Sequence, residues 1–215
     1  PNFEIPLPPI DIQKKIADEC KKVDEECKKA EQNIVNKKTD MVNLIGSVKG
    51  SSKAISSILK LASGNALPAN KMKKGNIPVY GGNGITGFHN VGFISEETIV
   101  IGRVGEYCGS VYLTEANCWI TDNALYCKEF LENVNKVYLT YALREAHLNQ
   151  YANRTGQPNI SQNALANVKI VMPSKTVQDD CSIQLLEIQK EIDTLQLKVA
   201  SCTKVKHDIL DKYLK

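Results

Sequence analysis

Apolar residues recur at helical spacing in two long stretches, one near each end of the chain. The apolar positions of the first stretch are Ile16, Cys20, Val23, Cys27, Ala30 and Ile34. Those of the second are Cys181, Leu185, Ile188, Ile192, Leu195 and Val199. Both sets follow a 4-3-4-3-4 spacing, with Lys, Glu and Asp between them, which is the pattern of a coiled-coil seam. The pattern predicts two long helices that pack together, most simply antiparallel, with the cysteines as small core residues.

The segments that lead into these two stretches resemble each other. "FEIPLPPIDIQ" aligns with "VKIVMPSKTVQ", so that Pro8 matches Pro173 and Gln13 matches Gln178. Each copy predicts a short strand, a proline that ends it, and a long helix. The repeat therefore sets apart a middle block that occurs once.

The middle block is rich in Val, Ile, Tyr and Thr, with glycines between the apolar runs. The runs "IPVYGG", "TIVIGR", "GSVYLTE" and "CWITDNALYCKEF" predict strands, and residues 135–151 predict a helix. Ser161 is the expected N-cap of a short helical turn, and "VKIVMP" is the expected closing strand. The predicted fold class is α+β, a compact β-rich domain with two long antiparallel coiled-coil helices. The expected divisions are residues 1–48, 49–173 and 174–215.

Charge and composition narrow the function classes. The chain is 42% hydrophobic and 24% charged with a net charge of +3, and no apolar run reaches the length of a membrane span. Residues 50–174 hold 11 Lys and Arg against 8 Asp and Glu. A basic block is compatible with nucleic-acid binding, although many other proteins have one. The seven cysteines form no C-x-x-C pair, so we expect reduced thiols in a cytoplasm and no metal site.

Most catalytic motifs are missing. Gly82, Gly84 and Gly87 satisfy G-x-G-x-x-G, but no helical pattern follows them to bind a pyrophosphate, so tight turns are the better interpretation. The chain has no phosphate loop, no zinc-protease motif and no nucleophile elbow. We therefore expect no cofactor and no catalytic activity.

Four of the segments above, read in order, resemble one known family. The chain resembles the specificity subunit of type I restriction-modification systems in the segments "IPVYGGNGITGFHN", "TIVIGRVGEYCGSVY", "CWITDNALY" and "TGQPNISQNALANVKIVMP", which lie between two long helices, with "IPLPPIDIQKKI" as the start of the other conserved region. The resemblance implies that residues 49–173 form a target recognition domain that reads one half of a split double-stranded DNA site. It also implies that the helices are spacers that dock methyltransferase subunits and, through them, the restriction subunit. It implies a subunit without catalytic activity.

The resemblance also suggests where DNA contacts lie. Our candidates, on predicted loops and strand ends of the basic block, are Lys71, Lys73, Lys74, Asn83, Thr86, His89, Arg103, Arg154 and Thr155. The alternative for Arg103 is an internal ion pair with Glu106 or Glu115. The turn residues Gly156, Gln157, Pro158 and Asn159 are expected to have a structural role, with Gln157 and Asn159 bonding to backbone groups.

Two other function classes remain open at this stage. One is a coiled-coil interaction or dimerisation protein with no DNA role. The other is a stand-alone DNA-modifying enzyme, although an adenine methyltransferase pocket of the [DN]PP[YF] type is missing. Because "FEIPLPP" matches the closing strand of a recognition domain, we expect a second such domain, either in the same full-length chain or from a homodimer partner.

Overall fold

The computed structural model describes residues 7–214 and divides the chain into two compact units. One unit comprises the chain up to Asn43 together with the chain from Gln184 onward, and the other is Leu44–Ile183. We call them the coil unit and the recognition unit. Both divisions fall inside long helices, rather than at the helix ends expected from the sequence. The strand predicted before Pro8 lies outside the described residues.

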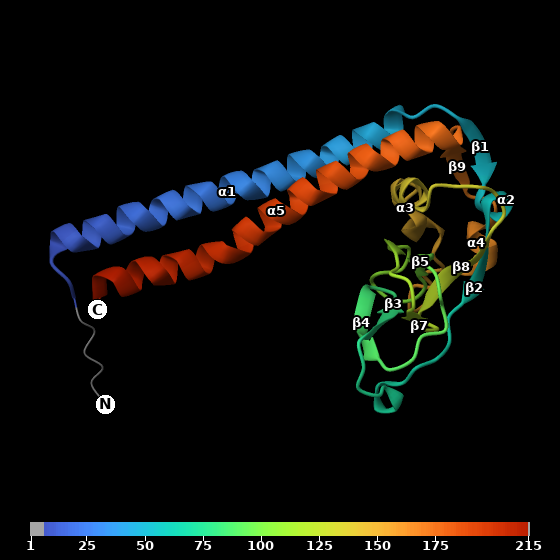
Figure 1. The fold of residues 1–215 in the computed structure, drawn as a ribbon, viewed down its shortest axis with the longest axis horizontal. Coiled ribbons are helices and arrows are strands. Elements are labelled where there is room, and N and C mark those ends of the chain that lie inside the picture. Colours follow the sequence, from blue (N-terminus) through green and yellow to red (C-terminus); the bar gives the residue numbers. More distant parts are fainter. Residues whose placement is uncertain (1–6, 215) are drawn as a thin grey trace. The chain divides into compact units, whose positions relative to one another are not determined.

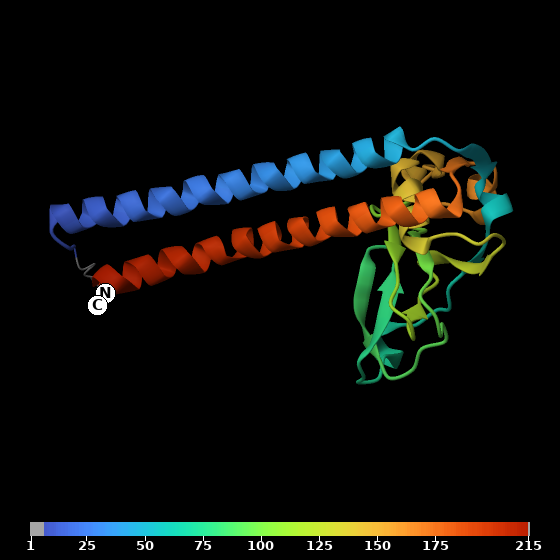
Figure 2. The same cartoon turned by 45° about the horizontal axis from the view of Figure 1, so that its top comes forward.

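The coil unit is formed by helices α1 (Ile10–Ser47) and α5 (Lys175–Leu214). Their ion pairs are Lys37–Glu191 at 2.5 Å, Glu26–Lys198 at 2.9 Å, Asp24–Lys206, and Glu19–Lys212 at 3.2 Å. Since partners on α5 move toward its C-terminus as those on α1 move toward its N-terminus, the two helices are antiparallel (Figures 1 and 2). Exposed pairs contribute little stability, so they mainly select the register.

The predicted seam lies along the contact between these helices. Of the predicted seam positions in the coil unit, Ala30, Leu185 and Ile192 are buried and the rest are at least partly covered. Cys202, beyond the predicted positions, is buried as well. Cys27 contacts Cys202 across the seam, and this contact, with desolvation, raises the pKa of the Cys27 thiol to about 11. Both cysteines therefore pack in the seam, which the spacing predicted for Cys27 but not for Cys202.

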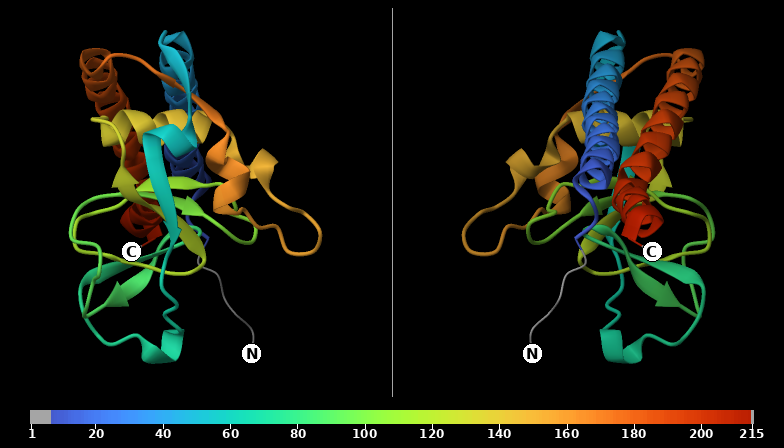
Figure 3. Two further views of the ribbon diagram at one scale, coloured as in Figure 1. Left: turned by 90° about the vertical axis from the view of Figure 1, so that its right-hand side faces the viewer. Right: turned by 90° about the vertical axis from the view of Figure 1, so that its left-hand side faces the viewer.

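The recognition unit contains three small sheets, shown in two further views in Figure 3. The four-stranded sheet has the order β2 (Leu59–Ser63), β8 (Ala124–Phe130), β5 (Ile99–Gly102), β6 (Val111–Leu113). The three-stranded sheet has the order β4 (Gly84–His89), β3 (Ile77–Gly81), β7 (Trp119–Ile120). Strands β1 (Ser51–Ala54) and β9 (Lys169–Met172) form the third sheet. The helices of the recognition unit are α2 (Ile55–Ile58), η1 (Ala69–Lys71), α3 (Lys136–Glu145), η2 (Leu148–Tyr151) and α4 (Gln162–Ala166).

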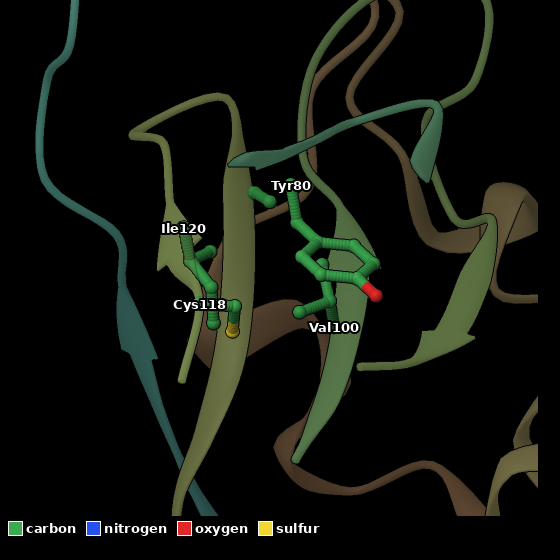
Figure 4. Packing of buried hydrophobic residues seen from close by; sticks show 5 residues of the cluster. Tyr80, Val100, Cys118 and Ile120 are labelled. Carbon is green, nitrogen blue, oxygen red and sulfur yellow. The ribbon is translucent and has the colours of Figure 1, made fainter. Parts of the chain in front are cut away.

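A shared core joins the two larger sheets. Tyr80 from β3 packs with Val100 from β5, Cys118, Ile120 and Ala124 (Figure 4). The Tyr80 hydroxyl accepts a hydrogen bond from a backbone amide at 3.0 Å, so its polar end is satisfied. The core thus fixes the β3–β4 hairpin against the four-stranded sheet.

Most predicted elements of the middle block are present, with three differences. The run at 118–130 is divided into β7 and β8 by a turn, and the helix at 135–151 stops at Glu145. His147, with φ 47, separates α3 from the 3-10 turn η2. Strands β1, β2 and β4 and helix α2 were not predicted. Ser161 does cap α4, since its hydroxyl accepts from the Ala164 amide at 3.2 Å.

A polar network joins α3 to the first turns of α5. Asn135 caps α3 by accepting from the Tyr138 amide at 3.0 Å. Its own amide donates to the side chain of Gln178 at 2.9 Å, and its side chain donates to Asp179 at 2.7 Å. The Ser182 hydroxyl donates to the same Asn135 oxygen at 2.7 Å. These contacts explain why α5 begins inside the recognition unit.

The repeat is visible in the hydrogen bonds at the start of both long helices. The Gln13 side chain donates to the carbonyl of Pro8 at 2.8 Å, and the Gln178 side chain donates to that of Pro173 at 3.0 Å. Each glutamine side chain thus donates a hydrogen bond to the proline five residues earlier in the chain. The two copies share a local structure as well as a sequence.

Candidate nucleic-acid interface

Arg103, directly after β5, has a rigid backbone. Its amide donates to Asn123 at 2.9 Å, and its carbonyl accepts from the Ile160 amide at 2.8 Å and from the Cys108 thiol at 3.1 Å. The guanidinium donates to the Ser63 hydroxyl at 3.2 Å. No carboxylate within residues 7–214 forms an ion pair with it, so the alternative pairing with a neighbouring glutamate is not found. Its charge is available to an external anion or acceptor.

The Arg103 side chain lies at a polar hollow of about 250 Å³. The hollow is lined by Ser63, Arg103, Leu125, Ser161, Gln162 and Asn163. Gln162 and Asn163 also line an adjoining hollow of about 320 Å³ beside α2 and β2. Arginine, asparagine and glutamine are the side chains that make paired hydrogen bonds to base edges. Gln162 and Asn163 were not among the DNA-binding residues predicted from the sequence. Their position as a polar pair directly after the N-cap Ser161 could have indicated them.

The turn "NRTGQPNIS" packs against the segment that follows Arg103. Gly156 adopts φ +90, and Asn153 and Asn159 exchange backbone hydrogen bonds at 2.8 and 3.0 Å. The carbonyl of Pro158 accepts from the Gly105 amide at 2.9 Å. The Asn159 side chain donates weakly to a backbone carbonyl at 3.4 Å.

Gln157 differs from the expectation for this turn. Within the described chain its side chain makes no backbone hydrogen bond, and it is exposed beside Gly105. Arg154 and Thr155 are exposed as well. Burial raises the pKa of the Cys108 thiol, while the charge of Arg154 acts to lower it, which places Arg154 close to the Arg103 segment. Two arginines therefore lie on the two packed segments of one region.

Asn83 belongs to the same region because two glycines allow close approach. A Cβ on Gly102 would lie 2.5 Å from the carbonyl oxygen of Gly82, so the β3–β4 turn rests directly on the end of β5. The Asn83 side chain accepts a hydrogen bond from the Tyr112 hydroxyl at 3.2 Å. Arg103, Arg154 and Asn83 thus come together, although they are far apart in sequence.

The three predicted lysines lie at the other end of β4. The Lys73 amide donates to His89 Nδ1 at 2.9 Å, which ties this segment to the strand end. Lys71, Lys73 and Lys74 are exposed, and none pairs with a carboxylate among the residues described. Strand β4 advances about 3.3 Å per residue over six residues, so roughly 17 Å separates the lysines from the Asn83 end.

Of the other candidates, His89 is buried, whereas Thr86 makes an internal hydrogen bond but stays at the surface. His89 is only 7% exposed and its ring packs edge-on against Trp119 at 5.7 Å, so it supports the lysine segment from within rather than from the surface. The Thr86 hydroxyl donates to the carbonyl of Val79 at 3.2 Å while the residue stays exposed. The surface candidates are therefore the arginines, the lysines, Asn83, Thr86 and Thr155.

The described residues include no metal-binding cluster, no helix directly after the G-x-G-x-x-G match and no membrane-spanning helix. Within residues 7–214, no group of three or more His, Cys, Asp and Glu side chains is arranged to hold a metal ion. The G-x-G-x-x-G match lies in the β3–β4 hairpin and leads into β4, so no helix N-terminus follows it. No helix in the described part of the chain has both the length and the apolar character needed to cross a bilayer.

In chain order, an α+β domain follows one long helix and precedes another, and the domain exposes cations that have no acidic partner among the residues described. A class of known proteins has this order of elements. Residues 50–210 match the family described as the type I restriction modification DNA specificity domain. The chain belongs to this family, which confirms the resemblance found in its sequence.

Individual relatives agree with this assignment. The chain is 28% identical over 164 residues to the type I restriction enzyme EcoprrI specificity subunit of Escherichia coli, covering 74% of this chain and 40% of that protein. It is similar in fold to the type I restriction-modification S subunit from M. genitalium, with a TM-score of 0.71, 17% identity, and coverage of 95% of this chain and 61% of that one. It is also similar to the HsdS subunit from Thermoanaerobacter tengcongensis, with a TM-score of 0.61, 17% identity, and coverage of 97% and 59%. The chain thus spans less than two thirds of each relative's length.

Proposed function

We propose that the recognition unit binds double-stranded DNA and reads one half of a bipartite site for a type I restriction-modification complex. The observation that carries this proposal is Arg103, an unpaired guanidinium on a rigid backbone, in a hollow that also presents Gln162 and Asn163. Arg154 and Asn83 extend the surface around it. Preorganised donors of this kind suit base edges and phosphates better than a small-molecule substrate.

The coil unit has a complementary role in this proposal. It acts as a spacer and docks methyltransferase subunits, which in turn engage the restriction subunit. A second recognition domain, from the same full-length chain or from a homodimer partner, reads the other half-site. The chain itself contributes recognition and no catalysis. A coiled-coil protein without a DNA role would explain neither the unpaired cations nor the family membership.

The test compares Arg103→Ala with Lys128→Ala, a control that removes an exposed cation elsewhere on the unit. Selection from a pool of 30-bp duplexes with a randomised centre identifies the bases that the wild-type chain prefers. We expect Arg103→Ala to relax preference at one position, by about 1–3 kcal/mol if the contact is a bidentate one to a base. Arg103→Lys, which keeps the charge but not the planar fork, should restore affinity without that preference. Equal behaviour of all three variants would contradict the proposal.

A further inference from the structure

Strand β4 is an edge strand that exposes two large apolar side chains. It pairs only with β3, so one of its sides is open. Ile85 and Phe88 on this strand are 46% and 55% exposed. An isolated exposed apolar residue is ordinary, but two together on an open edge of a sheet are a liability unless something covers them.

A bulge brings these two side chains to the same face. Phe88 is opposite Pro78 and Ile85 is opposite Tyr80, with the register shift at Thr86 between them. Since Pro78 and Tyr80 are two residues apart on β3, their partners share a face. Without the bulge, Ile85 and Phe88 would point to opposite faces because they are three residues apart.

The hairpin is stiff beneath these side chains. His89 contacts Trp119 edge-on at 5.7 Å, Trp119 contacts Phe93 at 5.1 Å, and Phe93 contacts Tyr126 at 6.0 Å. Pro78 and Tyr80, opposite the two exposed residues, are themselves buried. Ile85 and Phe88 share the face of these buried partners but stay accessible on the outer strand, which is paired along its length and is not a loop.

Positive charge lies beside the same strand, on the face that carries Gly87 and His89. Lys73 is joined to the end of β4 through His89, and the Met72 side chain packs close to Gly87 of the strand. Lys71, Lys73 and Lys74 therefore lie next to the strand, and none has an acidic partner in the described chain. The occupant of this edge must accept apolar contact and supply negative charge along several ångströms. Stacked bases between phosphate strands meet both requirements.

We propose that the edge of β4 engages duplex DNA by inserting Phe88, backed by Ile85, at a base step, while the three lysines hold the adjoining phosphates. This inference rests on the proposed DNA-binding function and adds a mode of contact to it. Proteins that place an apolar wedge between base pairs unstack the step and bend the duplex. The roughly 17 Å of β4 corresponds to about five base steps at 3.4 Å each, so the wedge lies at the flank of the bases near Arg103.

The test uses the full chain and two DNA probes that need no knowledge of the target sequence. One probe is a random-sequence 30-bp duplex pool, and the other is that pool with a two-nucleotide bulge at its centre, which is already kinked. A protein that must unstack DNA prefers the kinked probe because part of the deformation has been made in advance. We expect the wild-type chain to bind the bulged pool at least about tenfold more tightly, which corresponds to about 1.4 kcal/mol.

Three variants separate the apolar contact from the ionic one. Ile85→Ala/Phe88→Ala should remove the preference for the bulged pool but leave the salt dependence of binding unchanged, since no phosphate contact is lost. Lys71→Ala/Lys73→Ala/Lys74→Ala should keep the preference and lower the salt slope by about three units. Leu131→Ala, which removes an apolar side chain that is 40% exposed just after β8, is the control and should match the wild type.

The possible results distinguish failure of the proposed DNA binding from failure of the wedge alone. If the wild-type chain fails to bind either pool in a salt-dependent manner, the proposed DNA-binding function fails. If it binds but shows no preference for the bulged pool, or if the double variant keeps that preference, only the wedge is refuted. If the double variant instead loses a protein partner, seen as a lower mass by light scattering, with DNA binding intact, the edge is a protein-docking surface and the inference is overturned.

Discussion

The network around Asn135 yields a quantitative prediction. Replacement by alanine removes the oxygen that accepts from the Tyr138 amide at 3.0 Å and from the Ser182 hydroxyl, and the nitrogen that donates to Asp179. The backbone amide that donates to Gln178 remains. The substitution therefore removes the cap of α3 and two side-chain contacts with α5. Both helices can still form.

The magnitude follows from these contacts. Loss of an N-cap costs about 1 kcal/mol, and each of two hydrogen bonds contributes about 0.5–1.5 kcal/mol. The contact with Asp179 is partly exposed and counts toward the lower value. The sum is about 2–3 kcal/mol, which for a chain of this size lowers the melting temperature by roughly 4–12 °C.

The assay is thermal unfolding followed by circular dichroism, with hydrogen exchange at the first turn of α3 as a local measurement. Asn135→Ser should recover about 1 kcal/mol, because serine caps the helix but does not reach Asp179. Asn149→Ala, an exposed asparagine on η2, is the matched control. If Asn135→Ala lowers the melting temperature no more than this control, the network does not stabilise the junction and the reasoning is refuted.

Three further predictions concern titration and backbone strain. The pKa of Cys27 is about 11, so iodoacetamide should label it slowly in the native protein at pH 8, with a rate that rises up to about pH 11, whereas the unfolded chain should react readily. The hydrogen bond from Lys175 is the main cause of a lowered pKa at Asp179. The stabilisation from this ion pair is complete above the ordinary pKa of about 3.9 and is lost as the pH falls through the lower folded pKa. Asp179→Asn should therefore destabilise the protein at pH 6, and the difference from the wild type should shrink as the pH falls below that ordinary value, as measured by urea unfolding. Both Gly109 and Gly156 have φ +90, but a Cβ on Gly109 would lie 2.3 Å from a backbone nitrogen and one on Gly156 meets nothing, so Gly109→Ala should prevent stable folding while Gly156→Ala costs about 1–2 kcal/mol in the same assay.

The coiled coil was predictable from sequence because a single local rule specifies it. Each seam position depends only on residues three and four places away, and the spacing from Ile16 to Ile34 predicts the covered face of α1. Strand β4 was missed for the opposite reason. "GITGFH" contains two glycines and a bulge at Thr86, so its apolar positions do not alternate. Its pairing with β3 comes from the tertiary core around Tyr80.

The candidate site was predictable in part. Unpaired cations such as Arg103 are visible in sequence as charges on strand ends, and the structure shows which have no acidic partner. Gln162 and Asn163 were not singled out because their role depends on a hollow shared with β2, a hundred residues earlier in the chain. His89 was expected on a polar loop, but it ends strand β4 and the fold buries it against Trp119.

The matched hydrogen bonds at Gln13 and Gln178 have a consequence for how such genes change. Each bond closes a proline–helix junction using only residues within five positions of the glutamine. A genetic crossover at either junction would therefore join a foreign domain to a helix start that keeps this one local contact, while the bonds from Asn135 to Gln178 and Asp179 depend on the domain itself. Because this bond is local and occurs twice, we expect a domain exchanged at these two junctions to leave both bonds intact.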